Sequence, residues 1–228
     1  MVVPNVIDFD GPVPEVDPVA VRKAIGLTED DILILQPTRV VPRKGIEHAI
    51  NLVSRLKDPR CKLIISHESG DEGDTYLLAL QDAAQDANVD LRLVTTVVPD
   101  VVDGLVQPLD AGSLGLWDLY GAADLVTYPS LYEGFGNALL EAFFYRVPVL
   151  INRYSIFIQD IEPKGFRTIT MDGFITPDVV AAVRRILDDR NARKEMGNHN
   201  FQVASRYFSY SILRRRLQTL VINVMGMD

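Results

Sequence analysis

Short, predominantly apolar runs recur along the chain, and stretches of helical periodicity separate them. Six of the runs predict β-strands, at residues 32–36, 62–66, 91–94, 124–128, 148–152 and 167–171. Because these runs are nearly continuous instead of alternating, each strand is expected to be buried on both faces. Strands of this kind that alternate with helices are typical of α/β folds with a parallel sheet.

Helical spacing of apolar residues follows the strands and predicts what covers the sheet. Helices are expected over 46–56, 76–87, 113–123 and 136–146. Residues 176–178, Thr-Pro-Asp, supply the start signals of another helix, and Ser209 is expected to cap a last one. The opening segment contains four prolines up to Pro18 and is expected to be extended. The pattern therefore predicts a Rossmann-like parallel sheet with helices on both faces.

Composition and charge exclude several classes of protein. The 228 residues, 47% hydrophobic and 24% charged, show no internal repeat and no low-complexity linker, so we predict one domain over residues 1–228. A net charge of −8 argues against nucleic-acid binding, which uses basic faces. The single cysteine, Cys61, excludes an internal disulfide and a cysteine-rich zinc site, and we expect it to be a buried thiol.

The sequence shows neither a membrane span nor a signal peptide. No apolar run reaches the length that a span requires, and the first ten residues lack a basic start and a long apolar stretch. A cytoplasmic location is therefore expected. Three consecutive arginines, 214–216, fit the solvated edge of the last helix better than an anionic membrane surface, although peripheral membrane contact stays compatible with them.

Two carboxylates, Glu133 and Glu141, stand on either side of a Gly134-Phe135-Gly136 step in a mostly apolar stretch. Glu133 is expected in the loop after a strand, at the carboxyl edge of the sheet, where open parallel sheets bind their ligands. Glu141 is expected in a helix that is apolar on nearly every side. Burial of an unpaired carboxylate costs several kcal/mol, so a polar group is expected to meet Glu141.

The same stretch has the features of a phosphate site. Gly134 and Gly136 allow a sharp turn and a close approach to a ligand, and the amides that begin the next helix are free donors at the positive end of the helix dipole. Those amides belong to Asn137, Ala138 and Leu139. A second, cationic element follows the first strand at 38–45, TRVVPRKG, and contains Arg39, Arg43 and Lys44. Both elements follow strands, so we expect Arg39 and Lys44 to hold a diphosphate together with the helix-end amides.

Each of these features alone also fits an ordinary structural role. Basic residues between a strand and a helix are most often solvated or paired with surface acids. Glu141 could pair with an arginine inside the core, and Glu133 on a loop would ordinarily face solvent. Only the combination of the two carboxylates, the glycine step and the cationic loop favours a ligand site.

The motifs of this region resemble a known signature. Its parts are Pro129-Ser130, Glu133-Gly134-Phe135-Gly136, Glu141-Ala142 and Pro148-Val149. Together they resemble the retaining glycosyltransferases of family 4, also called glycosyltransferase group 1. The segments VPNVID (3–8) and DLYGAADLVTYPS (118–130) are similar to the same family. The resemblance spans nearly the whole chain and implies the C-terminal half of a glycosyltransferase B-type (GT-B) fold, the domain that binds the nucleotide-sugar donor.

The resemblance also implies roles for individual residues. Arg39 and Lys44 would neutralise the donor diphosphate in place of a metal ion, so neither a metal nor a cofactor is expected beyond the donor itself. Glu133 would be the catalytic candidate, contacting the donor sugar near its reacting carbon. Glu141 would accept hydrogen bonds from the ribose hydroxyls, and a neutral diol would satisfy a buried carboxylate. Whether Glu133 attacks that carbon or the acceptor enters on the face that the phosphate leaves stays open.

Three functions are compatible with these residues. The first is the donor half of a transferase; since the family binds its acceptor on an N-terminal domain that we expect to be absent here, donor binding with little transfer is predicted. The second is a non-catalytic nucleotide-sugar module that acts as a sensor or scaffold and is indifferent to Glu133. The third, a dinucleotide-dependent oxidoreductase, is disfavoured because residues 36–45 contain only Gly45 where a glycine-rich fingerprint should follow the first strand.

The chain departs from the family pattern in four places. Thr38 and Arg146 stand where the family usually has glycine, and residues 67–73 lack the usual glycine pair. Residues 152–166, NRYSIFIQDIEPKGF, replace a glycine-rich loop. We expect these departures to alter recognition of the donor sugar and base more than the diphosphate site.

Overall fold

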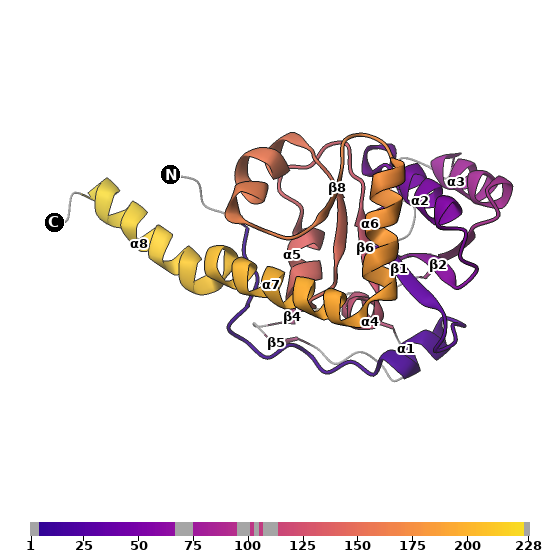
Figure 1. Ribbon diagram of the computed structural model, residues 1–228. Coiled ribbons are helices and arrows are strands. Elements are labelled where there is room, and N and C mark those ends of the chain that lie inside the picture. The colour runs from indigo at the N-terminus through magenta and orange to yellow at the C-terminus, as the bar shows by residue number, and fades with distance from the viewer. Residues whose placement is uncertain (1–4, 67–74, 95–100, 103–104, 107–113, 226–228) are drawn as a thin grey trace.

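A six-stranded parallel sheet forms the centre of the molecule (Figure 1). The computed structural model describes residues 5–66, 75–94, 101–102, 105–106 and 114–225. The six strands are β1 (Ile32–Gln36), β2 (Cys61–Ile65), β3 (Asp90–Leu93), β6 (Leu125–Tyr128), β7 (Val149–Asn152) and β8 (Ile169–Met171). Their order is β3-β2-β1-β6-β7-β8, and a separate antiparallel pair joins β4 (Val101–Val102) to β5 (Leu105–Val106). The predicted parallel sheet is confirmed, with each strand within two residues of its predicted range.

Helices cover both faces of this sheet, as the continuous apolar strands require. One face carries α1 (Pro18–Ala24), α4 (Leu116–Ala122), α5 (Asn137–Phe144) and α7 (Arg190–Phe208); the other carries α2 (Ile46–Leu56), α3 (Thr75–Asp86) and α6 (Pro177–Asp188). In β1, Leu33 and Leu35 pack in the first core and Ile34 in the second, all fully buried. The last helix, α8 (Tyr210–Met225), extends away from the body of the molecule (Figure 1).

The sequence offers capping residues at three helix boundaries, and two of them act as caps. The Thr176 hydroxyl accepts a hydrogen bond from the Val179 amide at the start of α6, as predicted. The described residues 5–17 contain no helix, and α1 begins at Pro18, where the Asp17 carboxylate accepts hydrogen bonds from the Val19 and Ala20 amides. Ser209 separates α7 from α8, but its hydroxyl contacts the Ser211 hydroxyl at 2.7 Å instead of capping a backbone amide.

Two further segments differ from expectation. Helix α7 went unpredicted because it is mostly polar, and the Asp189 carboxylate caps it. The segment 152–166 forms a short π-helix, Phe157–Ile161, followed by a 3₁₀ turn, Glu162–Lys164. Residues 67–73 and residue 113 lie outside the described part of the chain. No helix within the described residues combines the length and the apolarity that crossing a membrane demands.

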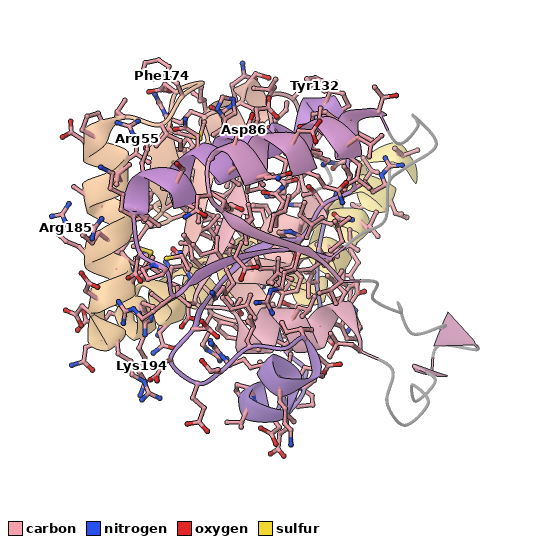
Figure 2. The ribbon with its side chains drawn as sticks, turned by 90° about the vertical axis from the view of Figure 1, so that its right-hand side faces the viewer. Arg55, Asp86, Tyr132, Phe174, Arg185 and Lys194 are labelled. Atoms are coloured by element: carbon pink, nitrogen blue, oxygen red, sulfur yellow. The ribbon has the colours of Figure 1, made fainter. Side chains whose placement is uncertain are left out.

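The strand order fixes where a ligand can bind. The chain proceeds outward from β1 to β3 on one side and from β6 to β8 on the other, so the order reverses between β1 and β6. In sheets of this order ligands bind outside the carboxyl ends of the strands at that switch point. Figure 2 labels Tyr132 and Phe174, which follow β6 and β8, at one end of the sheet, and Lys194 of α7 at the other.

Candidate functional site

A cleft of about 440 Å³ opens at the switch point between β1 and β6. Its lining comes from the loop after β1, from the end of β6 with the loop and helix that follow it, and from two residues elsewhere. The lining residues are Asn5, Pro37, Thr38, Arg39, Arg43, Lys44, Leu116, Tyr128, Glu133, Gly136, Asn137, Ala138 and Glu141. The cationic loop and the glycine step, which are about 90 residues apart in the sequence, therefore meet at one cleft.

Close backbone contact holds the two loops together. After β1 the chain makes a 3₁₀ turn at Pro42–Lys44, and Gly45 adopts a left-handed conformation, with φ of 60°, before α2 begins. A Cβ on Gly45 would stand 2.6 Å from the Pro129 carbonyl oxygen, so the approach of the two loops requires glycine. The Leu131 amide also donates to the Arg43 carbonyl at 2.9 Å. The relative position of the two loops is thereby set by the backbone.

Lys44 and Glu133 form a buried ion pair inside the cleft. The Lys44 ammonium donates to Glu133 Oε1, and the two side chains are 9% and 8% exposed. The Arg43 guanidinium lies 3.4 Å from Glu133 Oε2 and is 41% exposed. Burial raises the pKa of Glu133, but hydrogen bonds and the charge of Lys44 outweigh it and hold the pKa below its ordinary value. Burial lowers the pKa of Lys44, and Glu133 opposes that shift only in part.

Arg39 differs from the other two cations of the cleft. Its side chain is exposed and makes neither an ion pair nor a hydrogen bond with any described residue. Lys44 and Arg43 already share Glu133, whereas the charge of Arg39 is available to an incoming anion. An ammonium has three donors, so Lys44 also keeps donors that its bond to Glu133 does not use.

The turn before α5 supplies unpaired amides. Gly136 has a φ of 101°, and a Cβ at this position would stand 2.6 Å from the Tyr128 hydroxyl, so both conformation and space require glycine. The amides of Gly136, Asn137 and Ala138 have no acceptor among the described residues. The Leu139 amide, by contrast, donates to the Gly136 carbonyl at 3.1 Å. The free donors at this helix end therefore begin one residue earlier than predicted.

Glu141 meets a tyrosine instead of a cation. The Tyr120 hydroxyl from α4 lies 2.8 Å from Glu141 Oε2 and 3.1 Å from the Ala138 carbonyl. The expectation that a polar group would meet this carboxylate is thus confirmed. Burial raises the pKa of Glu141, and the Tyr120 hydrogen bond offsets only part of the effect. The carboxylate therefore retains capacity for further donors on the cleft side.

Three of the residues predicted to bind substrate do not line the cleft. Gly134 is exposed next to it. The Phe135 ring packs edge-on against Phe208, with centroids 5.2 Å apart, and is partly buried against the core. The Leu139 side chain is fully buried and its amide is used within the first turn of α5. The register of α5 turns Leu139 toward the core, whereas Phe135 precedes the helix.

Sequence reasoning missed several lining residues as well. Tyr128 ends β6, and its ring lies 5.7 Å from the Lys44 ammonium. Asn5 donates to the Asn137 side chain at 2.7 Å, which brings the start of the described chain to the cleft. Both lie in segments that resemble the family, 3–8 and 118–130, but neither was assigned to the site; the position of Tyr128 at the carboxyl end of a predicted central strand could have identified it. Within the described residues, no three His, Cys, Asp or Glu side chains gather as a metal site needs.

Comparison with known proteins identifies similar sequences. Residues 112–203 match the family described as glycosyl transferases group 1. The chain is 30% identical to the mannosylglucosylglycerate synthase of Thermotoga maritima, over 97% of this chain and 56% of that protein. It is 32% identical to the Petrotoga mobilis enzyme of the same name, over 75% of this chain and 43% of that protein. The chain thus spans about half the length of the curated relatives it matches.

Solved structures of low sequence identity share the fold. Anabaena HepE in complex with UDP superposes with a TM-score of 0.77 at 17% identity, over 96% of this chain and 57% of that one. A glycosyltransferase from Rickettsia africae gives 0.78 at 12% identity, over 100% and 58%. These likenesses establish a Rossmann-like domain of the GT-B type. Residues 112–203 match the group 1 glycosyltransferases, and over a larger part of its length the chain is similar to the curated mannosylglucosylglycerate synthases.

Proposed function

We propose that this chain binds a nucleotide-diphosphate sugar in the cleft between β1 and β6 and is the donor domain of a retaining glycosyltransferase that needs no metal ion. One observation carries the proposal: two loops remote in sequence bring three cations and the free amides of a helix start to one cleft at the switch point. The names of the relatives and the UDP complex of a structural neighbour support it.

The charges of the cleft suit a diphosphate. Arg39 has no side-chain partner among the described residues, and the ammonium of Lys44 has donors left beside Glu133. Charge-assisted hydrogen bonds of this kind are roughly twice as strong as neutral ones. The amides of Gly136, Asn137 and Ala138 add donors at the positive end of α5. These groups could neutralise phosphate oxygens as a metal ion does in other transferases.

The two carboxylates would contact the ribose and the sugar of the donor. Glu141 is held by Tyr120 on one side and lines the cleft on the other, where ribose hydroxyls would satisfy its remaining lone pairs. Glu133 stands beside Lys44, and therefore next to the phosphate whose bond to the sugar breaks. From there it could orient the sugar and stabilise positive charge at the anomeric carbon.

Calorimetric titration with UDP, GDP and ADP tests the proposal. We expect one nucleotide to bind and Arg39→Ala to weaken it about tenfold or more, because the lost charge-assisted hydrogen bond is worth roughly 1.5 to 3 kcal/mol. Arg39 is the better choice over Lys44, since its removal uncovers no buried carboxylate. Arg185→Ala, an equally exposed arginine on α6 (Figure 2), is the matched control. Binding of none of the three nucleotides would refute the proposal.

A nucleotide-sugar module without transfer activity is the second candidate, and one observation favours it. The carboxylate of Glu133 is already occupied by Lys44 and Arg43, which gives it a structural role that requires no chemistry. Incubation with UDP-, GDP- and ADP-hexoses, followed by mass spectrometry of released or transferred sugar, separates the two. Turnover that Glu133→Gln abolishes while nucleotide binding persists supports the transferase. Nucleotide binding without turnover by the unmodified protein supports the module.

A further inference from the structure

Tyr154 stands behind the glycine step and contacts its backbone. It follows β7, within the segment that replaces the glycine-rich loop of the family, and its side chain is 3% exposed. Its hydroxyl donates to the Phe135 carbonyl at 2.8 Å. Tyr154 is not among the residues that line the cleft. The contact is therefore made from the side of the turn away from any ligand.

Because the peptide bond is planar, this contact also sets the orientation of the amide on the other side of the turn. The carbonyl of Phe135 and the amide of Gly136 belong to one trans peptide unit, in which C=O and N–H point in opposite directions. Because the carbonyl points at Tyr154, the amide points away from it. Gly136 lines the cleft, and its amide has no acceptor among the described residues. The free N–H is thus directed to the cleft by a bond on the opposite face.

Aromatic rings packed around Tyr154 restrict the conformation of its side chain and of the turn. Its ring packs against the rings of Tyr128 and Phe157, with centroids 6.3 Å and 6.0 Å apart. The Tyr128 hydroxyl in turn fills the space beside the α-carbon of Gly136. A glycine with a φ of 101° would otherwise sample many peptide orientations. The two tyrosines therefore restrict a residue whose own backbone is permissive.

We propose that Tyr154 is a positioning residue for the donor phosphates: by holding the Phe135 carbonyl, it presents the Gly136 amide to the diphosphate. The inference rests on the proposed function and names a residue that the donor itself does not touch. A preorganised amide binds an anion better than a mobile one because its orientation is already fixed before the anion arrives. The segment that lacks the family's glycines would then serve the same site by a different contact.

Nuclear magnetic resonance on the unmodified protein gives the first test. Selective ¹⁵N-glycine labelling of the 15 glycines reduces the spectrum to few amide signals, and Gly136→Ala assigns the one of interest. On titration with UDP, or with GDP or ADP if calorimetry selects one of these, we expect a downfield shift of the Gly136 amide proton. The matching nucleoside, which lacks phosphate, should not produce it. Equal shifts with nucleotide and nucleoside, or no shift with either, would overturn the inference.

Tyr154→Phe gives the second test, with Tyr145→Phe as its control. The Tyr145 hydroxyl is also buried but has no hydrogen-bond partner among the described residues, so the same substitution there removes no contact. We expect Tyr154→Phe to weaken nucleoside diphosphate binding about tenfold, or 1.4 kcal/mol, and to leave nucleoside binding unchanged, whereas Tyr145→Phe changes neither. A purely structural role of Tyr154 would weaken both ligands alike.

The outcomes separate this inference from the function on which it rests. If the unmodified protein binds no nucleotide, the proposed function fails. If it binds one and Tyr154→Phe binds it equally well, only the inference fails. Should Tyr154→Phe not fold, as circular dichroism would show, the amide shift of Gly136 in the unmodified protein decides.

Discussion

The buried pair of Lys44 and Glu133 makes a quantitative prediction about stability. Three variants test it: Lys44→Met, Glu133→Gln, and the two together. The Lys44 and Glu133 side chains are 9% and 8% exposed, so each single variant leaves a buried charge without its partner. The double variant leaves neither charge, and Met and Gln keep the approximate shape of the original side chains. With the unmodified protein, the three variants form a double-mutant cycle, which measures the interaction free energy between the two side chains.

The two single variants should differ in cost. Removing one partner of a buried pair typically costs about 3 to 5 kcal/mol. Glu133→Gln leaves the Lys44 charge with a neutral amide oxygen and the Tyr128 ring beside it, so we expect about 3 kcal/mol. Lys44→Met leaves Glu133 with Arg43, which is 41% exposed and compensates weakly, so about 2 kcal/mol is expected. The double variant should lie within about 1 kcal/mol of the unmodified protein, because desolvating the pair costs nearly what their attraction returns.

Urea denaturation followed by circular dichroism measures all four proteins, and its pH dependence supplies an independent check. The pKa of Glu133 in the folded protein is below its ordinary value, so the unfolded chain takes up the proton first as the pH falls. Stability supplied by the ionised carboxylate is therefore complete above the ordinary glutamate range and is lost as the pH falls through the folded value. The double variant should lack this loss. Single variants that each cost under about 1 kcal/mol at pH 7 would refute the reasoning.

Two further predictions concern the other carboxylate and the glycine turn. Burial raises the pKa of Glu141, so its ionisation lowers the stability of the protein as the pH rises above the ordinary glutamate value. In thermal denaturation, Glu141→Gln should therefore be more stable than the unmodified protein at pH 8 but not at pH 4. Its nucleotide affinity should fall about tenfold or more. A result with equal stability at both pH values would contradict this. Gly136→Ala should cost about 1 to 3 kcal/mol in urea denaturation, and Tyr128→Phe in the same chain should recover part of it, because the hydroxyl is the group that a Cβ would meet at 2.6 Å. No recovery would mean that the positive φ alone sets the cost.

The sheet could be predicted from the sequence because burial on both faces leaves a local pattern. The residues of β1, Ile-Leu-Ile-Leu-Gln, are apolar at consecutive positions since Leu33 and Ile34 serve opposite cores. Helix α7 leaves no such pattern. Most of its residues are polar, and the helix approaches its neighbour closely at Gly197, where a Cβ would stand 1.9 Å from the Arg146 carbonyl oxygen. Its buried face combines Gly197 and Asn200 with the apolar Ala204 and Phe208, so apolar side chains supply only part of it.

The candidate site was predictable as a meeting of loops but not as a set of contacts. The carboxyl ends of β1 and β6 must lie at one edge of a parallel sheet, so Arg39, Lys44 and the glycine step could be brought together on topology alone. That Lys44 pairs with Glu133 depends on side-chain distances across 89 residues, which no local pattern encodes. The same holds for Tyr120 beside Glu141, because the sequence required a polar partner without identifying it.

The departures of this chain from the family pattern also acquire a physical meaning once the contacts are known. Glycine-rich loops let a backbone approach a phosphate, but they leave the orientation of each amide to be fixed by the ligand. In this chain the segment after β7 lacks those glycines, and Tyr154 instead fixes a peptide of the neighbouring loop from behind. The loop after β7 has thus lost flexible glycines, and the peptide between Phe135 and Gly136 has gained a hydrogen bond that restrains it. If Tyr154→Phe leaves the Gly136 amide as responsive to phosphate as before, this account of the substitution is wrong and the tyrosine serves only the core.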